Sequence, residues 1–358
     1  MALGGGQLMT ASNLQASQQP SADAFAAFIA EQTGARQANV IGFDKLSGGA
    51  IQDNFGLTLE LDGGDRPGHQ AFVVRQDAPS GIAFSLNRVQ EFAVLKAAYA
   101  AGVTTPEPLW LCEDPSISGQ TFYVMSRAAG SASPRQLIKT AFSEQQRRDI
   151  VHRLGVELAN LHQVRPPDET LDFLPLPGSL HPALNRIAEY RRYLAAIDEP
   201  HPVLEWALNW LAERMPAAGP TVLCHNDFRT GNYMMDEDRL TAVLDWEFAA
   251  WGDPAEDLGW LCCRSWRFGA SQFEVGGIGY RKDLLQSYRE ATGYQIDEST
   301  VSYWEVMALV RWAMIALQQA ERHLSGQQRS LELVLTGRMV AQMESDLLDQ
   351  IQELEATP

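Results

Sequence analysis

The chain has 358 residues, of which 45% are hydrophobic and 20% charged, an ordinary composition for a globular protein with one large core or two lobes. Its formal net charge of -17 argues against nucleic acid as a partner. No apolar run approaches the roughly 20 residues that span a bilayer. The N-terminus also lacks the charged and apolar regions of a signal peptide, so we expect no membrane partner and a cytoplasmic location. The four cysteines have no zinc-site spacing and are expected to be buried free thiols.

The first third of the chain predicts a small lobe built mainly of strands. Residues 1–21 are rich in Gly, Ser, Gln and Ala without periodicity, which predicts a flexible tail. Next comes a predicted helix that Ser21 caps and Gly34 ends. The stretch that follows is typical of a strand, a turn at Gly48 and Gly49, and a second strand.

Charged residues follow in the next strand and helix. Arg75 lies near the end of a β-branched run, and Glu91 in the helix after it is placed to pair with Arg75. Phe92, Leu95 and Tyr99 are expected to share the buried face of that helix. Two more strands, separated by a turn at residues 114–119, complete the lobe.

Helical periodicity dominates from Ala128 onward. One amphipathic helix carries apolar residues at three- and four-residue spacing, namely Ile150, Leu154, Leu158 and Leu161. His162 ends this helix, and we expect it to be structural. The segment GDPAEDLGW predicts a helix start in which Pro254 occupies the first turn, while Asp253 and Asp257 cap the helix and brace the preceding loop.

Four polar residues with a defined spacing mark the predicted centre of the chemistry. His225-x-Asp227-x4-Asn232 is followed by an apolar strand that ends at Asp245. Phosphoryl transfer to a hydroxyl needs a carboxylate near the acceptor proton and hard oxygen ligands for magnesium. Asp227 would orient or deprotonate the acceptor, and Asn232 and Asp245 would hold Mg²⁺.

The motifs HNDFRTGN and LDWEFAAWGDPAEDLGWL resemble those of the aminoglycoside phosphotransferase family, and the resemblance covers nearly the whole chain after the tail. It implies an α+β, two-lobed protein-kinase-like fold, with a small antiparallel-sheet lobe over residues 22–127 and a mainly helical lobe over 128–358. The implied activity is transfer of the ATP γ-phosphate to a hydroxyl of a small molecule.

The resemblance also implies roles for the first lobe in binding ATP. Gly48 and Gly49 would lie over the phosphates, although a plain β-turn is the alternative. Arg75 falls where kinases carry a phosphate-binding lysine, and its planar guanidinium is not a geometric copy of an ammonium. Phe122–Ser126 would connect the lobes beside adenine, which makes Val124, Met125 and Arg127 candidate nucleotide neighbours or, alternatively, core residues.

Two features of the second lobe concern the transferred group and its acceptor. Arg229 would either stabilise charge on the γ-phosphoryl or form a plain salt bridge. The C-terminal helices should wall the acceptor pocket, and their aromatic and sulfur-containing residues either line it or belong to the core; they are Trp304, Trp312 and Met314.

The acceptor itself is predicted from Arg264 and Arg267, which lie among aromatic residues that include Trp266. Arginine with aromatic surface suits an anion-bearing metabolite such as a hydroxyacyl-CoA, which some kinase-like proteins of the broader family phosphorylate. Pairing of both arginines with nearby acids is the alternative. An aminoglycoside acceptor and a catalytically silent nucleotide-binding protein remain the competing functions. The sequence does not specify ATP against GTP or an oligomeric state.

Overall fold

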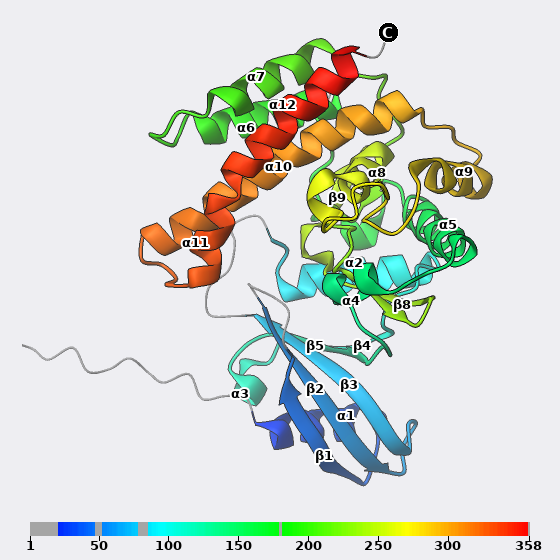
Figure 1. The fold of residues 1–358 in the computed structure, drawn as a ribbon. Helices are drawn as coiled ribbons and strands as arrows, with labels where there is room; N and C mark the ends of the chain where they lie inside the picture. Colours follow the sequence, from blue (N-terminus) through cyan, green and yellow to red (C-terminus); the bar gives the residue numbers. More distant parts are fainter. Residues whose placement is uncertain (1–20, 47–51, 78–84, 179–180, 357–358) are drawn as a thin grey trace, which may run out of the picture.

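The computed structural model describes residues 21–46, 52–77, 85–178 and 181–356. Figure 1 shows two parts, a β-sheet with few helices at one end and a larger helical part at the other. The predicted tail, apart from Ser21, and the predicted turn at Gly48 and Gly49 lie outside the described residues. Among the helices of the described ranges, none combines the length and apolar character that a membrane span requires.

The smaller part is built on a five-stranded antiparallel sheet in the order β1-β2-β3-β5-β4. Its elements are α1 (Ala22–Thr33), β1 (Gln37–Lys45), β2 (Gln52–Asp62), β3 (Gly68–Asp77), α2 (Arg88–Ala100), β4 (Pro108–Cys112), α3 (Pro115–Ser118) and β5 (Phe122–Ser126). The short helix α3 replaces the turn predicted at 114–119. It forms because Asp114 accepts a hydrogen bond from the Ser116 N–H and Pro115 suits a first helical position.

Side-chain alternation along the strands gives this sheet two different faces. Val74 on β3 and Val124 on β5 point to the face that packs against α1. Val73 and its partner Met125 point to the opposite face, whose core includes residues of α2. Arg75 stands two residues after Val73 and therefore projects toward α2 as well.

The helix α2 joins the sheet to the helical part. The Asn87 side chain begins it with a capping box, and Phe92 and Leu95 are buried as predicted. The prediction for Tyr99 is wrong, since this side chain is 47% exposed. The last turn of α2 buries Ala98 in its place.

The larger part is mainly helical. Its elements are α4 (Pro134–Lys139), α5 (Glu144–Leu161), η1 (Glu169–Leu171), α6 (Pro182–Leu194), α7 (Pro202–Glu213), β6 (Val222–Cys224), β7 (Tyr233–Asp236), β8 (Arg239–Val243), η2 (Trp246–Phe248), β9 (Ala250–Gly252), α8 (Pro254–Cys262), η3 (Arg264–Trp266), α9 (Arg281–Thr292), α10 (Glu298–Leu324), α11 (Leu331–Arg338) and α12 (Val340–Ala356). The four predicted apolar positions of α5 are all buried. The long helix α10 packs against α7, α8, α11 and α12. The α+β organisation that the resemblance implies, a sheet lobe followed by a helical lobe, is therefore present.

Candidate active site

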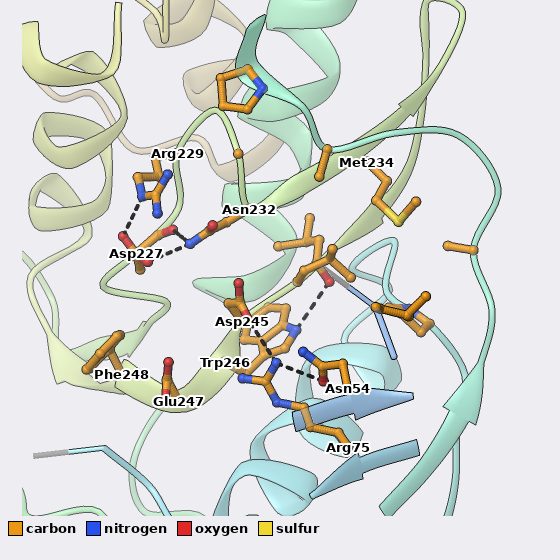
Figure 2. A pocket seen from close by; sticks show the side chains of 18 of the residues that line it. Asn54, Arg75, Asp227, Arg229, Asn232, Met234, Asp245, Trp246, Glu247 and Phe248 are labelled. Carbon is orange, nitrogen blue, oxygen red and sulfur yellow. Dashed lines mark hydrogen bonds and ion pairs between the residues drawn. The ribbon is translucent and has the colours of Figure 1, made fainter. Parts of the chain in front are cut away.

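The loop between β6 and β7 carries Asp227 and holds its carboxylate in place. Asp227 Oδ1 accepts hydrogen bonds from Arg229 Nε at 3.1 Å and from Trp260 Nε1 at 2.9 Å. Asn232 Nδ2 donates to Asp227 Oδ2 at 2.5 Å and to the Asp227 main-chain oxygen at 3.0 Å. Figure 2 shows Asp227, Arg229 and Asn232 joined by these contacts. A carboxylate with three side-chain donors has a fixed orientation.

Buried hydrogen bonds from this loop to Asp257 hold its backbone in place. Asp257 at the start of α8 accepts from the main-chain N–H groups of His225 and Asn226, both at 2.7 Å, as the sequence predicts for a loop brace. His162 contacts the same carboxylate at 3.2 Å, in the structural role expected of it. Burial raises the pKa of Asp257, but the hydrogen bonds from His162 and from the His225 main-chain N–H, with the electrostatic contributions of both side chains, outweigh burial and hold it below its usual value.

His225 links the loop to the strand that leads to Asp245. Its Nε2 donates to the main-chain oxygen of Leu244 at 2.9 Å, while its Nδ1 accepts from the N–H of Asp227. The N–H of Leu244 in turn donates to the main-chain oxygen of Asn232 at 2.7 Å. These bonds place Asn232 and Asp245 beside each other.

Asp245 has a backbone conformation that few residues other than glycine adopt. It follows β8 with a φ of 63°, in the left-handed region. Non-glycine residues in this region cluster at functional sites, where the surrounding structure holds them. Asp245 Oδ1 accepts a hydrogen bond from Arg75 Nη1 at 2.8 Å, which Figure 2 shows.

Arg75 is the centre of a buried ion-pair network between the lobes. Its side chain is only 5% exposed and pairs with Glu91 through Nη2 at 3.0 Å and through Nε at 3.1 Å. Arg88, which is fully buried, also pairs with Glu91, and Arg88 Nε lies 2.9 Å from Asp77. The predicted pairing of Glu91 with Arg75 is therefore present. Asn54 on β2 lies 3.5 Å from the same guanidinium.

A cavity of about 790 Å³ separates the lobes and contains these groups. Its walls come from β2, β3, β5, the loop between β6 and β7, α8, α10 and α11. Among the predicted site residues, those that line it are Arg75, Met125, Arg127, Asp227, Arg229, Asn232, Asp245, Trp266 and Trp312. The cavity thus brings the phosphoryl-transfer candidates of both lobes together.

Val124 does not belong to this site. It is fully buried in the core that β5 shares with α1, on the sheet face opposite the cavity. The prediction that Val124 neighbours the nucleotide is wrong because side chains alternate along a strand, and Met125 has the cavity-facing position. The predicted connection between the lobes, Phe122–Ser126, is itself strand β5. The connection begins after this strand.

The structure also corrects the predicted acceptor arginines. Arg264 pairs with Glu353 of α12, and Arg267 donates to the main-chain oxygen of Cys262 at 2.9 Å and lies 3.8 Å from Glu305 of α10. Neither lines the cavity, so their pairing with acids, the alternative reading of the sequence, is what the structure contains. Of the three predicted acceptor residues, only Trp266 lines the cavity.

Arg311 of α10, which sequence reasoning did not select, completes the acceptor side. It lines the cavity with Trp260 and with Trp312, for which the sequence left open a place in the pocket or in the core. Trp304 and Met314 are core residues. The signal for Arg311 was available, since it is a single charge inside the apolar stretch VMALVRWAMIAL of a long helix. Arg311 is half-buried, and a charge withdrawn from water in such a stretch is favoured by a partner or a ligand.

Comparison with known proteins places the fold and the site in a family. A profile described as the phosphotransferase enzyme family matches residues 43–294, which is more than half of the chain and includes the whole catalytic segment. The chain belongs to the phosphotransferase enzyme family.

Members of the acyl-CoA dehydrogenase family are among its relatives. Acyl-CoA dehydrogenase family member 11 of Rattus norvegicus is 27% identical over 286 residues, which are 76% of this chain and 36% of the relative. The protein of that name from Gallus gallus is 33% identical over 200 residues, 53% of this chain and 25% of the relative. The chain therefore spans about a third or less of the length of these relatives.

Solved structures share the two-lobed fold. A protein of Ralstonia eutropha JMP134, provisionally named as an aminoglycoside phosphotransferase, superposes with a TM-score of 0.71 at 22% identity and covers 93% of this chain and 98% of its own. Aminoglycoside phosphotransferase APH(4)-Ia in complex with ADP and hygromycin B has a TM-score of 0.57 at 17% identity, with coverages of 91% and 98%. At these identities the likeness establishes the protein-kinase-like fold.

Proposed function

We propose that this protein is an ATP- and Mg²⁺-dependent phosphotransferase that moves the γ-phosphate to a hydroxyl of a small molecule. One observation carries the proposal. Asp227, Asn232 and Asp245 of the second lobe meet Arg75 of the first lobe in a single cavity, with a direct Arg75–Asp245 contact of 2.8 Å. Phosphoryl transfer needs this combination of an acceptor-orienting carboxylate, oxygen ligands for a metal and positive charge.

Asp227 is assigned the orientation of the acceptor hydroxyl. Its carboxylate is fixed by Arg229, Asn232 and Trp260, so it can accept the hydroxyl proton in one defined direction. Because the transition state of phosphoryl transfer is loose, alignment contributes as much as removal of the proton. Arg229 lies beside this carboxylate, and we assign it the role of stabilising the negative charge that develops on the transferred phosphoryl group.

Asn232 and Asp245 have the donor chemistry for Mg²⁺. The amide nitrogen of Asn232 donates to Asp227, which leaves its Oδ1 for a cation, and Asp245 supplies an anionic oxygen. Hard oxygen ligands of this kind suit Mg²⁺, which when bound would neutralise phosphate charge. Arg75 is held between Glu91 and Asp245 and presents a permanent positive charge to the cavity for the same purpose.

We further propose that the acceptor is a hydroxyacyl-CoA or a similar anionic metabolite. Arg229 and Arg311 both stand at the acceptor side, where their guanidinium carbons lie 4.5 Å from the Trp266 ring and 4.7 Å from the Trp260 ring. Arginine on aromatic surface suits an acceptor with an anionic and an apolar part and repels a polycation. The names of the matched relatives, acyl-CoA dehydrogenase family members, are consistent with an acyl-CoA metabolite near this activity.

An aminoglycoside acceptor is the competing function. Its support is the fold shared with an APH(4)-Ia complex that contains hygromycin B. A polycationic antibiotic needs carboxylates around it, and the two arginines at the acceptor side argue against it. A catalytically silent protein has less support, because the base and both metal-ligand candidates are present and converge.

Magnesium-dependent ADP release across two acceptor panels separates these functions. One panel contains hydroxyacyl-CoA thioesters of different chain length and hydroxyl position, and the other contains aminoglycosides. We expect turnover with the first panel alone. Efficient turnover of aminoglycosides without activity on any thioester would contradict the proposed acceptor, and ATP binding without turnover in either panel would support a silent protein.

A further inference from the structure

The acceptor side of the cavity is lined by a row of three tryptophans. Trp266 packs between the other two, with ring centroids 5.2 Å from Trp260 and 5.0 Å from Trp312. All three line the cavity, although they come from α8, η3 and α10. Trp260 donates its indole N–H to Asp227, which places this row directly beside the catalytic carboxylate.

The indole N–H groups of Trp266 and Trp312 have no hydrogen-bond acceptor among the described residues. Trp266 Nε1 and Trp312 Nε1 are both buried. Trp266 as a whole is 5% exposed. A buried N–H group without a partner costs about 1–3 kcal/mol, so native proteins normally supply an acceptor atom. Both residues line the cavity, but their Nε1 atoms have almost no solvent-accessible surface, so these two N–H groups are not open to a ligand.

Arg311 adds a positive charge to the same row. Its guanidinium lies 4.7 Å from the Trp260 ring and donates to Asn226 Oδ1 at 3.4 Å. No carboxylate of the described residues lies within ion-pair distance of it, in contrast to Arg264 and Arg267. Arg311 is therefore a charged hydrogen-bond donor of the cavity wall, beside the tryptophan row, and has no acid partner among the described residues.

We propose that Arg311, beside the row of Trp260, Trp266 and Trp312, forms a subsite for the acyl carbonyl oxygen of the acceptor. This inference rests on the proposed function and identifies a residue that selects the acceptor. Trp260 contacts both Asp227 and Arg311, so a molecule whose carbonyl oxygen accepts hydrogen bonds at Arg311 has its hydroxyl near Asp227. A carbonyl or carboxylate oxygen only accepts hydrogen bonds and matches a donor-only surface, whereas the ammonium groups of an aminoglycoside only donate.

Binding measurements with and without the acyl group test the subsite. Wild type, Arg311→Met and Arg311→Lys are titrated with free CoA, acetyl-CoA, 3-hydroxybutyryl-CoA and free 3-hydroxybutyrate, each in the presence of a non-hydrolysable ATP analogue. Arg264→Met is the matched control, since Arg264 lies outside the cavity and pairs with Glu353. We expect Arg311→Met to weaken binding of the acylated ligands by about 10- to 100-fold, with partial rescue in Arg311→Lys and no change for free CoA.

The ligand that responds identifies the source of the oxygen. Weaker binding of both thioesters assigns the subsite to a thioester carbonyl, and weaker binding of free 3-hydroxybutyrate alone assigns it to a carboxylate. Equal weakening for free CoA would place Arg311 against the CoA moiety and overturn the subsite, as would unchanged binding of every ligand.

A second readout separates loss of the subsite from damage to the catalytic loop. Arg311 touches Asn226, so the slow hydrolysis of ATP without an acceptor is measured in each variant. We expect Arg311→Met to raise the KM for 3-hydroxybutyryl-CoA by a larger factor than it changes this hydrolysis, whereas Arg264→Met should keep the wild-type values of both. If the wild-type protein binds the thioesters in an Arg311-dependent way but transfers no phosphate to them, the proposed function is contradicted and the subsite is still supported. Phosphate transfer with unchanged kinetics in Arg311→Met would overturn the subsite alone.

Discussion

Arg75 of strand β3 donates a hydrogen bond to Asp245 at 2.8 Å across 170 residues of sequence and from one lobe to the other. The same guanidinium pairs with the buried Glu91 of α2. The guanidinium of Arg75, which we propose binds phosphate, is therefore positioned by the carboxylate of Glu91 and contacts the proposed metal ligand Asp245. Changes in this network should affect both the stability of the fold and the binding of nucleotide.

Glu91→Gln should destabilise the fold. The substitution leaves the buried guanidinium groups of Arg75 and Arg88 without their shared carboxylate, and removal of one partner of a buried ion pair costs about 3–5 kcal/mol. Urea unfolding followed by tryptophan fluorescence measures the loss. Glu60→Gln on the exposed end of β2 is the control and should change the free energy of unfolding by less than about 0.5 kcal/mol. Equal effects of the two substitutions would show that the network does not stabilise the lobe.

Asp245→Asn should remove the magnesium dependence of nucleotide binding. The amide has a neutral oxygen where the proposed Mg²⁺ ligand is anionic, so the added affinity that Mg²⁺ gives an ATP analogue should fall by about 10-fold or more. Calorimetric titration with and without Mg²⁺ measures this difference. Asp236→Asn lies on the same hairpin, outside the cavity, and should keep the wild-type response. A full Mg²⁺ effect in Asp245→Asn would assign the metal to other ligands.

Glu305 should make the stability of the protein depend on pH. Burial raises the pKa of this carboxyl to about 7, against the lowering effect of Arg281 and Arg267. The folded state then keeps a proton that the unfolded state releases near its ordinary pKa of 4.5. The contribution to stability is complete below about pH 4.5 and is lost as pH rises toward 7, by up to about 3 kcal/mol.

The matched variant for this prediction is Glu305→Gln. We expect the free energy of unfolding of wild type, relative to Glu305→Gln, to decline between pH 5 and pH 7.5 and to level off above that range. A parallel pH dependence of the two proteins would mean that Glu305 stays ionised throughout, held by its contact of 2.6 Å with Arg281.

The proximity of the proposed catalytic and metal-binding residues could be predicted because they are close in sequence. Asp227, Asn232 and Asp245 stand in one loop and the hairpin after it, and the spacing alone brings them together. The partnership of Arg75 with Glu91 was also predictable, because a strand followed by a packed helix places them on facing surfaces. Strict alternation along β5 would have excluded Val124 as well.

The acceptor side could not be predicted in the same way. Arg264 and Arg267 are next to the catalytic segment in sequence, but the acids that hold them come from the distant helices α12 and α10. The direction of a long guanidinium depends on such tertiary partners, which no local pattern contains. Arg311 has the opposite arrangement, since it lies far from the motif in sequence and lines the cavity in the fold.

The most direct test of the proposed function is transfer of labelled phosphate from [γ-³²P]ATP to 3-hydroxybutyryl-CoA or a related hydroxyacyl-CoA, with the product identified by mass spectrometry. Wild type and Asp227→Asn are compared at ATP concentrations that give equal occupancy of the nucleotide site. We predict a phosphorylated thioester with wild type and a rate lower by about 10²- to 10⁴-fold in Asp227→Asn, with nucleotide affinity unchanged. Equal rates in the two proteins, or no labelled thioester with any acceptor of the panel, would contradict the proposal.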